Sequence, residues 1–275
     1  MGQKISITNS NNTQDSRFLS FLKRFSPQKP SLDKNMSPRT GMFAKLTAPS
    51  ANKPNDFTRL ISNSISFAST RTKEYLLFKD PEGKFQPSLQ TLTQVFLMNY
   101  ITQSVNLDLT DTFNCTAMTP EQRILLGADW VWAILKKPTK NPKIQIAVQV
   151  LHLPEREEAE ERATAGKPIS ESIQMAQMES RNKNMYERIV DFCTSIGKDC
   201  YALFLFFGKR DDKVNIYGVL SNNFEAAVGK CDKIDRALIE NFFKGSRYFH
   251  TPFGMMQTIF TKKTEEALTL MIKFS

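Results

Sequence analysis

Apolar residues recur at helical spacing through the first half of the chain, after a long polar start. The spacing predicts a first helix that is capped by Asp56 and runs toward Phe78. A second helix is predicted after Ser88, and because its apolar residues surround most of its circumference, we expect it to be largely buried. A third begins at the capping box Thr119-Pro120-Glu121-Gln122 and is predicted to end at Lys136, Lys137 and Pro138.

The pattern then changes from helical spacing to the alternation of a strand. Apolar and polar residues alternate over residues 144–150, which predicts a half-buried strand. The run from Tyr201 to Phe207 is apolar throughout and predicts a strand buried on both faces, with residues 213–220 as its hairpin partner. Alternation over residues 268–274 predicts a final strand.

These elements together indicate the fold class. Further helices are predicted from Asn184 to a C-terminal cap at Gly197, and over residues 234–243. Residues 153–183 lose the pattern after a charged run, and we interpret them as a long flexible insertion. About four strands and five or six helices predict a single α+β domain over residues 56–275, with a small mixed or antiparallel sheet. Residues 1–55 are predicted to be a flexible basic tail.

The tail carries most of the net positive charge of the chain. The net charge is +9, and residues 1–56 hold nine Lys and Arg residues against three Asp residues. In a helix, one side of the tail would present Phe18, Phe21, Leu22 and Phe25, and the other Lys23 and Arg24. Each basic residue near an anionic leaflet contributes roughly 1 kcal/mol, so we expect these residues to contact an anionic membrane surface. Two alternatives remain open: the segment docks on the folded body, or the charges keep a disordered tail in solution.

The N-terminus offers a second membrane signal. Residues Met1 to Ser6 match the pattern Met-Gly-x-x-x-Ser/Thr, which predicts N-myristoylation of Gly2. One myristoyl chain binds a bilayer with K of only about 10⁴ M⁻¹, so the basic segment would complete the anchor. The longest apolar run has the length of a strand, and we expect a peripheral protein with no transmembrane segment. Nucleic acid is not an expected partner, because the tail lacks the dense basic clusters of nucleic-acid-binding motifs.

Catalytic motifs are not found in the sequence. Gly229-Lys230-Cys231 is not a phosphate loop, since Phe224 stands where glycine is required and no hydroxyl follows the lysine. His152 and His250 are isolated, which favours structural roles, and the four cysteines show no Cys-x-x-Cys spacing. We expect free, mostly buried thiols, no metal site, no cofactor and no enzymatic activity.

Several motifs resemble those of one known family. The segment Gly127-Ala128-Asp129-Trp130-Val131-Trp132, preceded by Met118-Thr119, is similar to the hallmark segment of the small vertebrate effector family of the fifteenth Rab GTPase. Further blocks agree in order and spacing: Met1-Gly2-Gln3-Lys4, Lys73-Glu74-Tyr75-Leu76, Phe96-Leu97 and Phe192-Cys193 with Ile196-Gly197. The resemblance covers most of residues 61–220. The length of the basic segment before Phe57 and the charged insertion depart from it.

The resemblance implies a function without catalysis. A member would bind a GTP-loaded Rab on the cytoplasmic face of endocytic recycling membranes and regulate receptor recycling. The γ-phosphate orders the switch segments of a GTPase, and apolar side chains on effector helices can contact the ordered surface. The candidate contacts are Ile61, Ile65 and Phe67 on the first predicted helix, and Asp129, Trp130 and Trp132 on the third.

Two alternatives accompany these candidates. On a helix, Trp130 and Trp132 would lie about 200° apart, so at most one could face a partner, and both can equally be core residues. Asp129 needs a polar partner or solvent, which a local hydrogen-bond network would supply as well as a GTPase would. A different function class also fits the tail: a lipid-anchored adaptor or lipid-binding module that does not distinguish nucleotide states.

Overall fold

The computed structural model describes residues 54–153, 168–180, 182–209, 212–224, 233–262 and 266–275. They belong to one compact unit, Thr47–Ser275. The tail predictions at Gly2, Phe18, Phe21, Leu22, Lys23, Arg24 and Phe25 lie outside the described residues. In chain order the helices are α2 (Pro54–Leu77), α3 (Leu89–Asn106), α4 (Pro120–Leu126), α6 (Glu171–Glu179), α7 (Met185–Ile196), α9 (Arg236–Gly245) and α10 (Pro252–Thr261). The strands are β1 (Phe113–Ala117), β2 (Trp130–Lys136), β3 (Asn141–His152), β4 (Cys200–Lys209), β5 (Asp212–Ser221) and β6 (Thr269–Lys273).

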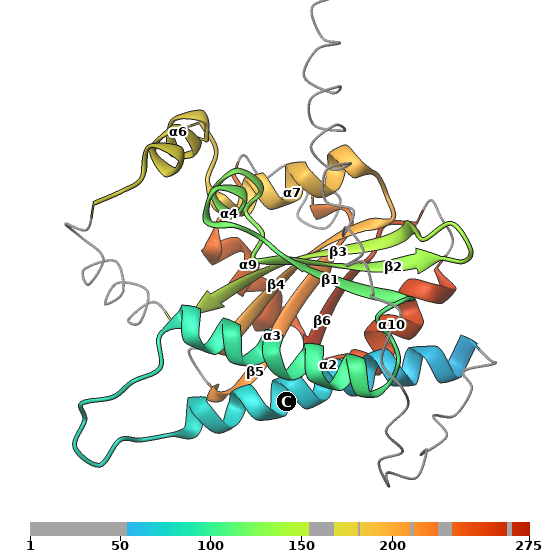
Figure 1. The fold of residues 1–275 in the computed structure, drawn as a ribbon, viewed down its shortest axis with the longest axis horizontal. Helices are drawn as coiled ribbons and strands as arrows, with labels where there is room; N and C mark the ends of the chain where they lie inside the picture. The colour runs from blue at the N-terminus through green and yellow to red at the C-terminus, as the bar shows by residue number, and fades with distance from the viewer. Residues whose placement is uncertain (1–53, 154–167, 181, 210–211, 225–232, 263–265) are drawn as a thin grey trace, which may run out of the picture. The chain divides into compact units, whose positions relative to one another are not determined.

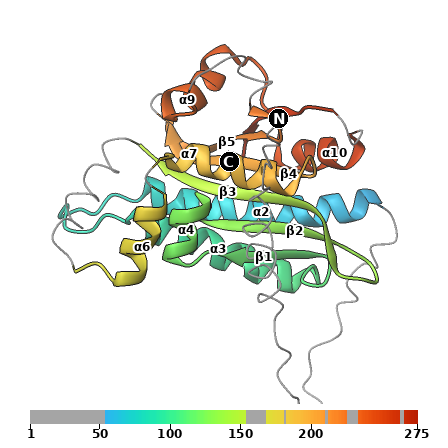
Figure 2. The ribbon, with the colours of Figure 1, turned by 90° about the horizontal axis from the view of Figure 1, so that it is seen from above.

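The strands form one mixed sheet in chain order, from β1 to β6 (Figure 1). Neighbouring strands are antiparallel except β3 and β4, which are parallel with Gln145 opposite Cys200. A parallel pair needs a crossover connection, and the chain between β3 and β4 includes α6 and α7. Figure 2 shows β1 to β5 in order across the molecule. The predicted α+β class is confirmed, and so is the hairpin of β4 and β5.

Helices cover both faces of the sheet. One face packs against α2, α3 and α10, and the strand β4 contributes Tyr201, Leu203, Leu205 and Phe207 to this core. The alternate residues of β4 point to the other face, where Phe204 lies 5.7 Å from the ring of Tyr186 on α7 and Phe206 lies 5.2 Å from Phe243 on α9. This confirms that β4 is buried on both faces. Strand β3 is also buried on both faces from Ile146 onward, so the prediction of a half-buried strand was wrong.

Local capping signals fixed several helix ends as predicted. The Thr119 hydroxyl accepts the Gln122 N–H at 3.3 Å, while the Gln122 side-chain oxygen accepts the Thr119 N–H at 2.8 Å. Asn184 begins α7 in the same manner, and Ser88 caps α3 by accepting the Thr91 N–H at 3.1 Å. Gly197 ends α7 with a φ of 121°. Helix α2 begins at Pro54, two residues before the predicted cap.

Several sequence expectations are corrected. The third helix ends at Leu126 rather than near Pro138, and the predicted second half of that helix forms β2. Strand β1 was not predicted either. The described sheet therefore has six strands instead of the predicted four. Part of the presumed flexible insertion is helix α6, which Ser170 caps. Helix α10 was not predicted. Finally, α3 is not buried all round, because it exposes Met98, Ile101 and Val105.

Candidate functional site

Trp130 and Trp132 lie on strand β2 and not on a helix. Residues two apart on a strand point to the same face, so both indoles enter the core together. The ring of Phe96 lies 5.4 Å from Trp130, and that of Tyr100 lies 5.4 Å from Trp132. Both tryptophans have 0% exposure, so neither side chain has surface for a partner in this fold. The structure supports the alternative in which both are core residues.

Gly127 brings the end of α4 against α7. It caps α4 with a φ of 70°, in the left-handed region that favours glycine. A β-carbon at this position would stand 2.3 Å from the Met185 carbonyl oxygen and 2.9 Å from the Ile189 amide nitrogen. The Arg188 guanidinium, one residue before Ile189, donates to the Ile124 carbonyl oxygen of α4. The glycine of the hallmark segment therefore serves helix packing.

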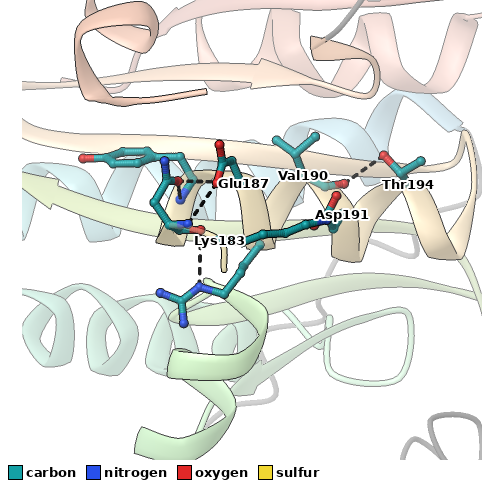
Figure 3. Close-up of polar contacts among 8 residues, drawn as sticks. Lys183, Glu187, Val190, Asp191 and Thr194 are labelled. Carbon is teal, nitrogen blue, oxygen red and sulfur yellow. Dashed lines mark hydrogen bonds and ion pairs between the residues drawn. The ribbon is translucent and has the colours of Figure 1, made fainter. Parts of the chain in front are cut away.

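Polar contacts fix the N-terminal half of α7 at this junction. The Asn184 side-chain oxygen accepts the N–H groups of Tyr186 and Glu187, each at 2.9 Å. The Glu187 carboxylate accepts the Asn184 N–H at 2.9 Å, which completes the capping box. Figure 3 shows these contacts together with the ion pair of Lys183 and Asp191, whose Nζ and Oδ2 atoms are 2.5 Å apart. Helix α7 is thus a well-anchored support for Gly127.

Asp129 connects α4, β2 and β3. Its Oδ1 lies 2.5 Å from Nε of Arg123, and its Oδ2 accepts the Val150 N–H at 2.6 Å. Its own N–H donates to the Val148 carbonyl oxygen at 2.7 Å. The side chain is only 8% exposed, and this burial raises the pKa of Asp129 above its ordinary value, while the Arg123 guanidinium acts in the opposite direction. The carboxylate is engaged inside the fold, as the local-network alternative expects.

The candidates on α2 are also largely interior. Ile61 and Ile65 have 0% exposure, and Phe67 is half-buried with the Arg71 guanidinium carbon 5.4 Å from its ring centre. Polar residues on α2 are buried too, because their hydroxyls donate to carbonyl oxygens one turn earlier, as Ser69 does to Ile65 at 2.9 Å. Among the three candidates on this helix, Phe67 is the one with exposed surface.

An exposed apolar surface lies instead on α3. Met98, Ile101 and Val105 are 59%, 49% and 58% exposed, and their spacing of three and four residues places them on one side of the helix. We call these three residues the α3 face. Helix α3 contains no charged residue in its 18 positions, although this side faces solvent. In the sequence, apolar residues surround most of the circumference of this helix, and that pattern predicted a largely buried helix.

Two further exposed apolar groups lie on other elements. Leu77, Phe78 and Phe85 flank the connection from α2 to α3, and the two phenyl rings meet edge to face at 5.9 Å. On α6, Met175 and Met178 are 64% and 59% exposed. Each group is apolar and available, but neither belongs to an uncharged helix, since Glu171 and Glu179 lie on α6.

The described residues also limit the chemistry of the fold. Within them, no three His, Cys, Asp or Glu side chains are grouped so that they could hold a metal ion. No helix in the same residues combines the length and hydropathy needed to cross a bilayer. The thiols of Cys115, Cys193 and Cys200 are free, and the latter two are buried.

Comparison with known proteins places the chain among the Rab effectors. The model of the Rab15 effector family matches residues 45–270. The Rab15 effector protein of Mus musculus is similar to the chain, with 29% identity over 185 residues, which are 66% of this chain and 75% of the mouse protein. The chain belongs to the Rab15 effector family. The names of the family and of the mouse protein both describe an effector of the GTPase Rab15.

Proposed function

We propose that this protein binds a Rab GTPase in the GTP-loaded form through the α3 face, and that it regulates receptor recycling from the endocytic recycling compartment. The observation that carries the proposal is an uncharged helix with three exposed aliphatic side chains about half accessible to solvent. Exposed apolar groups on one side of an uncharged helix are typical of an interface that a partner covers.

The α3 face suits a partner whose surface depends on its nucleotide. GTP orders the switch segments of a small GTPase through γ-phosphate and Mg²⁺ contacts, and hydrolysis releases them. An apolar helix face would gain binding free energy only when those segments form a continuous surface opposite it. Burying the remaining exposed part of each aliphatic side chain would contribute roughly 1 kcal/mol. We retain Phe67 as a secondary proposed contact, because it keeps some exposure.

We further propose that the basic tail holds the protein on the cytoplasmic face of endosomal membranes. The support comes from the sequence: the N-myristoylation pattern at Gly2 and the basic amphipathic residues 17–25. Each signal alone gives weak binding, and the two together would give residence. In this proposal the protein is peripheral, has no cofactor and performs no catalytic step.

Calorimetry of the full, non-lipidated chain against a panel of Rab GTPases tests the effector function. Each Rab is loaded either with a non-hydrolysable GTP analogue or with GDP. We expect heat of binding with the GTP form of at least one Rab and at least tenfold weaker binding with its GDP form, a difference of about 1.4 kcal/mol. Equal affinity for both forms of every Rab that binds would refute the nucleotide dependence. Absence of binding to the whole panel would leave the lipid-anchored adaptor as the better hypothesis.

A further inference from the structure

Exposed lysines gather on the β2–β3 hairpin. Lys136, Lys137, Lys140 and Lys143 lie within eight consecutive residues that include no acidic residue, and all four are exposed. Lys136 pairs with Asn141 across the hairpin, so the four lysines are held around one tight turn. We call this group the lysine end. Its charge is concentrated at one edge of the folded domain.

The sheet brings further basic residues to the same edge. Gln145 of β3 is opposite Cys200 of the parallel strand β4. Lys143 lies two residues before Gln145 and Lys198 two residues before Cys200, so both lysines lie at the same end of the two strands. The Lys262 ammonium lies 5.3 Å from the ring centre of Tyr201, the next residue of β4. Acidic residues at this edge are fewer: Asp111, whose Oδ1 is 2.6 Å from Nζ of Lys140, together with the exposed Asp108, Asp199 and Glu266. The edge keeps an excess of positive charge.

The N-terminal tail joins the domain at this same edge. Phe57, in the first turn of α2, lies 6.2 Å from the ring of Phe260 near the end of α10. The end of α10 carries Lys262, which reaches Tyr201 at the start of β4. Figure 1 shows the start of α2 and the β2–β3 hairpin toward the same side of the domain. Residues 1–53, with their basic excess, are therefore covalently attached beside the lysine end.

The sequence that follows β3 is rich in acidic residues. The run Glu155 to Glu161 holds five glutamates, and it follows Leu153 directly after β3 ends at His152. Strand β3 thus begins at the lysine end, and the acid-rich sequence follows the residue at which β3 ends. The excess of positive charge at the lysine end favours the approach of this edge to a negatively charged plane.

We propose that the lysine end is a second membrane-contacting surface, which binds anionic lipid headgroups with the tail. Lysine ammonium groups on long side chains suit a diffuse layer of phosphate and carboxylate charge. Because the tail is attached at the same edge, its membrane contact would raise the effective concentration of the lysine end at the bilayer. The inference concerns the folded domain and does not depend on the α3 face or on Rab binding.

Sedimentation with vesicles tests this surface on the full, non-lipidated chain. The vesicles are phosphatidylcholine alone, or phosphatidylcholine with about 30% phosphatidylserine. The variant K136Q/K137Q/K143Q removes three exposed charges and leaves Lys140 paired with Asp111. We expect the partition coefficient on the anionic vesicles to fall roughly 100-fold at low salt, since each of the three lysines near the surface contributes about fivefold. Binding to neutral vesicles should be weak for both proteins.

A matched variant separates position from net charge. K79Q/K84Q/K213Q also removes three exposed lysines, but these lie at the other end of the sheet from the lysine end. Lys79 and Lys84 follow the end of α2, and Lys213 is the second residue of β5. We expect it to keep most of the wild-type partition coefficient. Equal losses in the two variants, or no loss in K136Q/K137Q/K143Q, would overturn the proposal. Calorimetry with a GTP-loaded Rab provides the independent readout, because the α3 face is unchanged in both variants, so failure here and failure of the effector function are distinguishable.

Discussion

The backbone of Gly127 approaches Met185 so closely that a β-carbon on Gly127 would stand 2.3 Å from the Met185 carbonyl oxygen. The atom in the way is main chain, within a helix held by a capping box and an ion pair, so it cannot move aside as a flexible side chain would. The hallmark segment of the family therefore begins with a residue that the packing of two helices requires.

The substitution G127A should destabilise the fold through two separate effects. A left-handed φ costs a non-glycine residue roughly 1 kcal/mol, and overpacking against α7 adds about 1–3 kcal/mol. G83A is the matched control, because Gly83 has a φ of 67° with nothing within 4 Å of an added β-carbon. Urea unfolding should show G127A losing at least about 1 kcal/mol more than G83A. Equal losses would mean that α7 yields to the added methyl group.

Truncation of Asp129 should also destabilise the protein. D129A leaves the Val150 N–H without its carboxylate acceptor and removes the partner of Arg123, which predicts a loss of about 1–3 kcal/mol in the free energy of unfolding. E74A is the control, since Glu74 pairs with Arg71 at 3.0 Å on the exposed surface, and its loss should be below about 0.5 kcal/mol. Thermal or urea unfolding measures both. A D129A protein as stable as E74A would contradict the structural role of this carboxylate.

Cys115 gives a prediction about pH. The Cys115 thiol is partly buried against the core, and its desolvation raises its pKa to about 12, above the ordinary value of 9.0. A raised folded-state pKa means that the contribution of the protonated thiol to stability is complete below pH 9 and is lost as the pH rises toward 12. Iodoacetamide at pH 8 should accordingly alkylate Cys115 far more slowly in the folded protein than in urea. Peptide mass spectrometry follows the site, and rapid alkylation in the folded state would show that the thiol is accessible.

Local signals in the sequence were sufficient where a helix end depends on neighbouring residues. The capping box at Thr119 formed as predicted, and the predicted helix start at Asn184 is also held by a capping box, because each is a contact over three residues. The run from Trp130 to Lys136 was misassigned to a helix. A short apolar run has no decisive period, and only its pairing with β1 and β3 makes it a strand. The left-handed Gly127 was the available stop signal.

The candidate site was harder to predict, because burial is decided by packing between distant elements. Trp130 and Trp132 are conspicuous in the sequence, yet both are interior once β2 packs under α3. Nothing in the sequence distinguishes the exposed Ile101 from a buried isoleucine. Apolar residues surround most of α3, so their spacing does not show which side of the helix packs against the sheet. The resemblance identified the family correctly, while the residues Gly127, Asp129, Trp130 and Trp132 that carried it support the fold.

The α3 face gives the most direct prediction for function. M98E and I101E each place a charge on an exposed position, so folding should be little affected, whereas a partner surface that is apolar would have to bury an unpaired carboxylate. We expect the double variant M98E/I101E to weaken binding to a GTP-loaded Rab at least 100-fold, about 2.7 kcal/mol, by calorimetry. Far-UV circular dichroism and the unfolding midpoint should match those of the wild type.

The control is M175E/M178E on α6, which has the same chemistry and spacing on another helix, with side chains 64% and 59% exposed. We expect this variant to bind with nearly wild-type affinity, because the proposed contact does not involve α6. A loss of Rab binding in M175E/M178E, with wild-type affinity retained in M98E/I101E, would move the interface to α6. Equal retention of affinity by both double variants would exclude both helix faces and direct attention to Phe78 and Phe85, the exposed aromatic pair between α2 and α3. Each outcome identifies a different surface. Measuring four proteins, namely the wild type, M98E/I101E, M175E/M178E and F78A/F85A, therefore locates the contact.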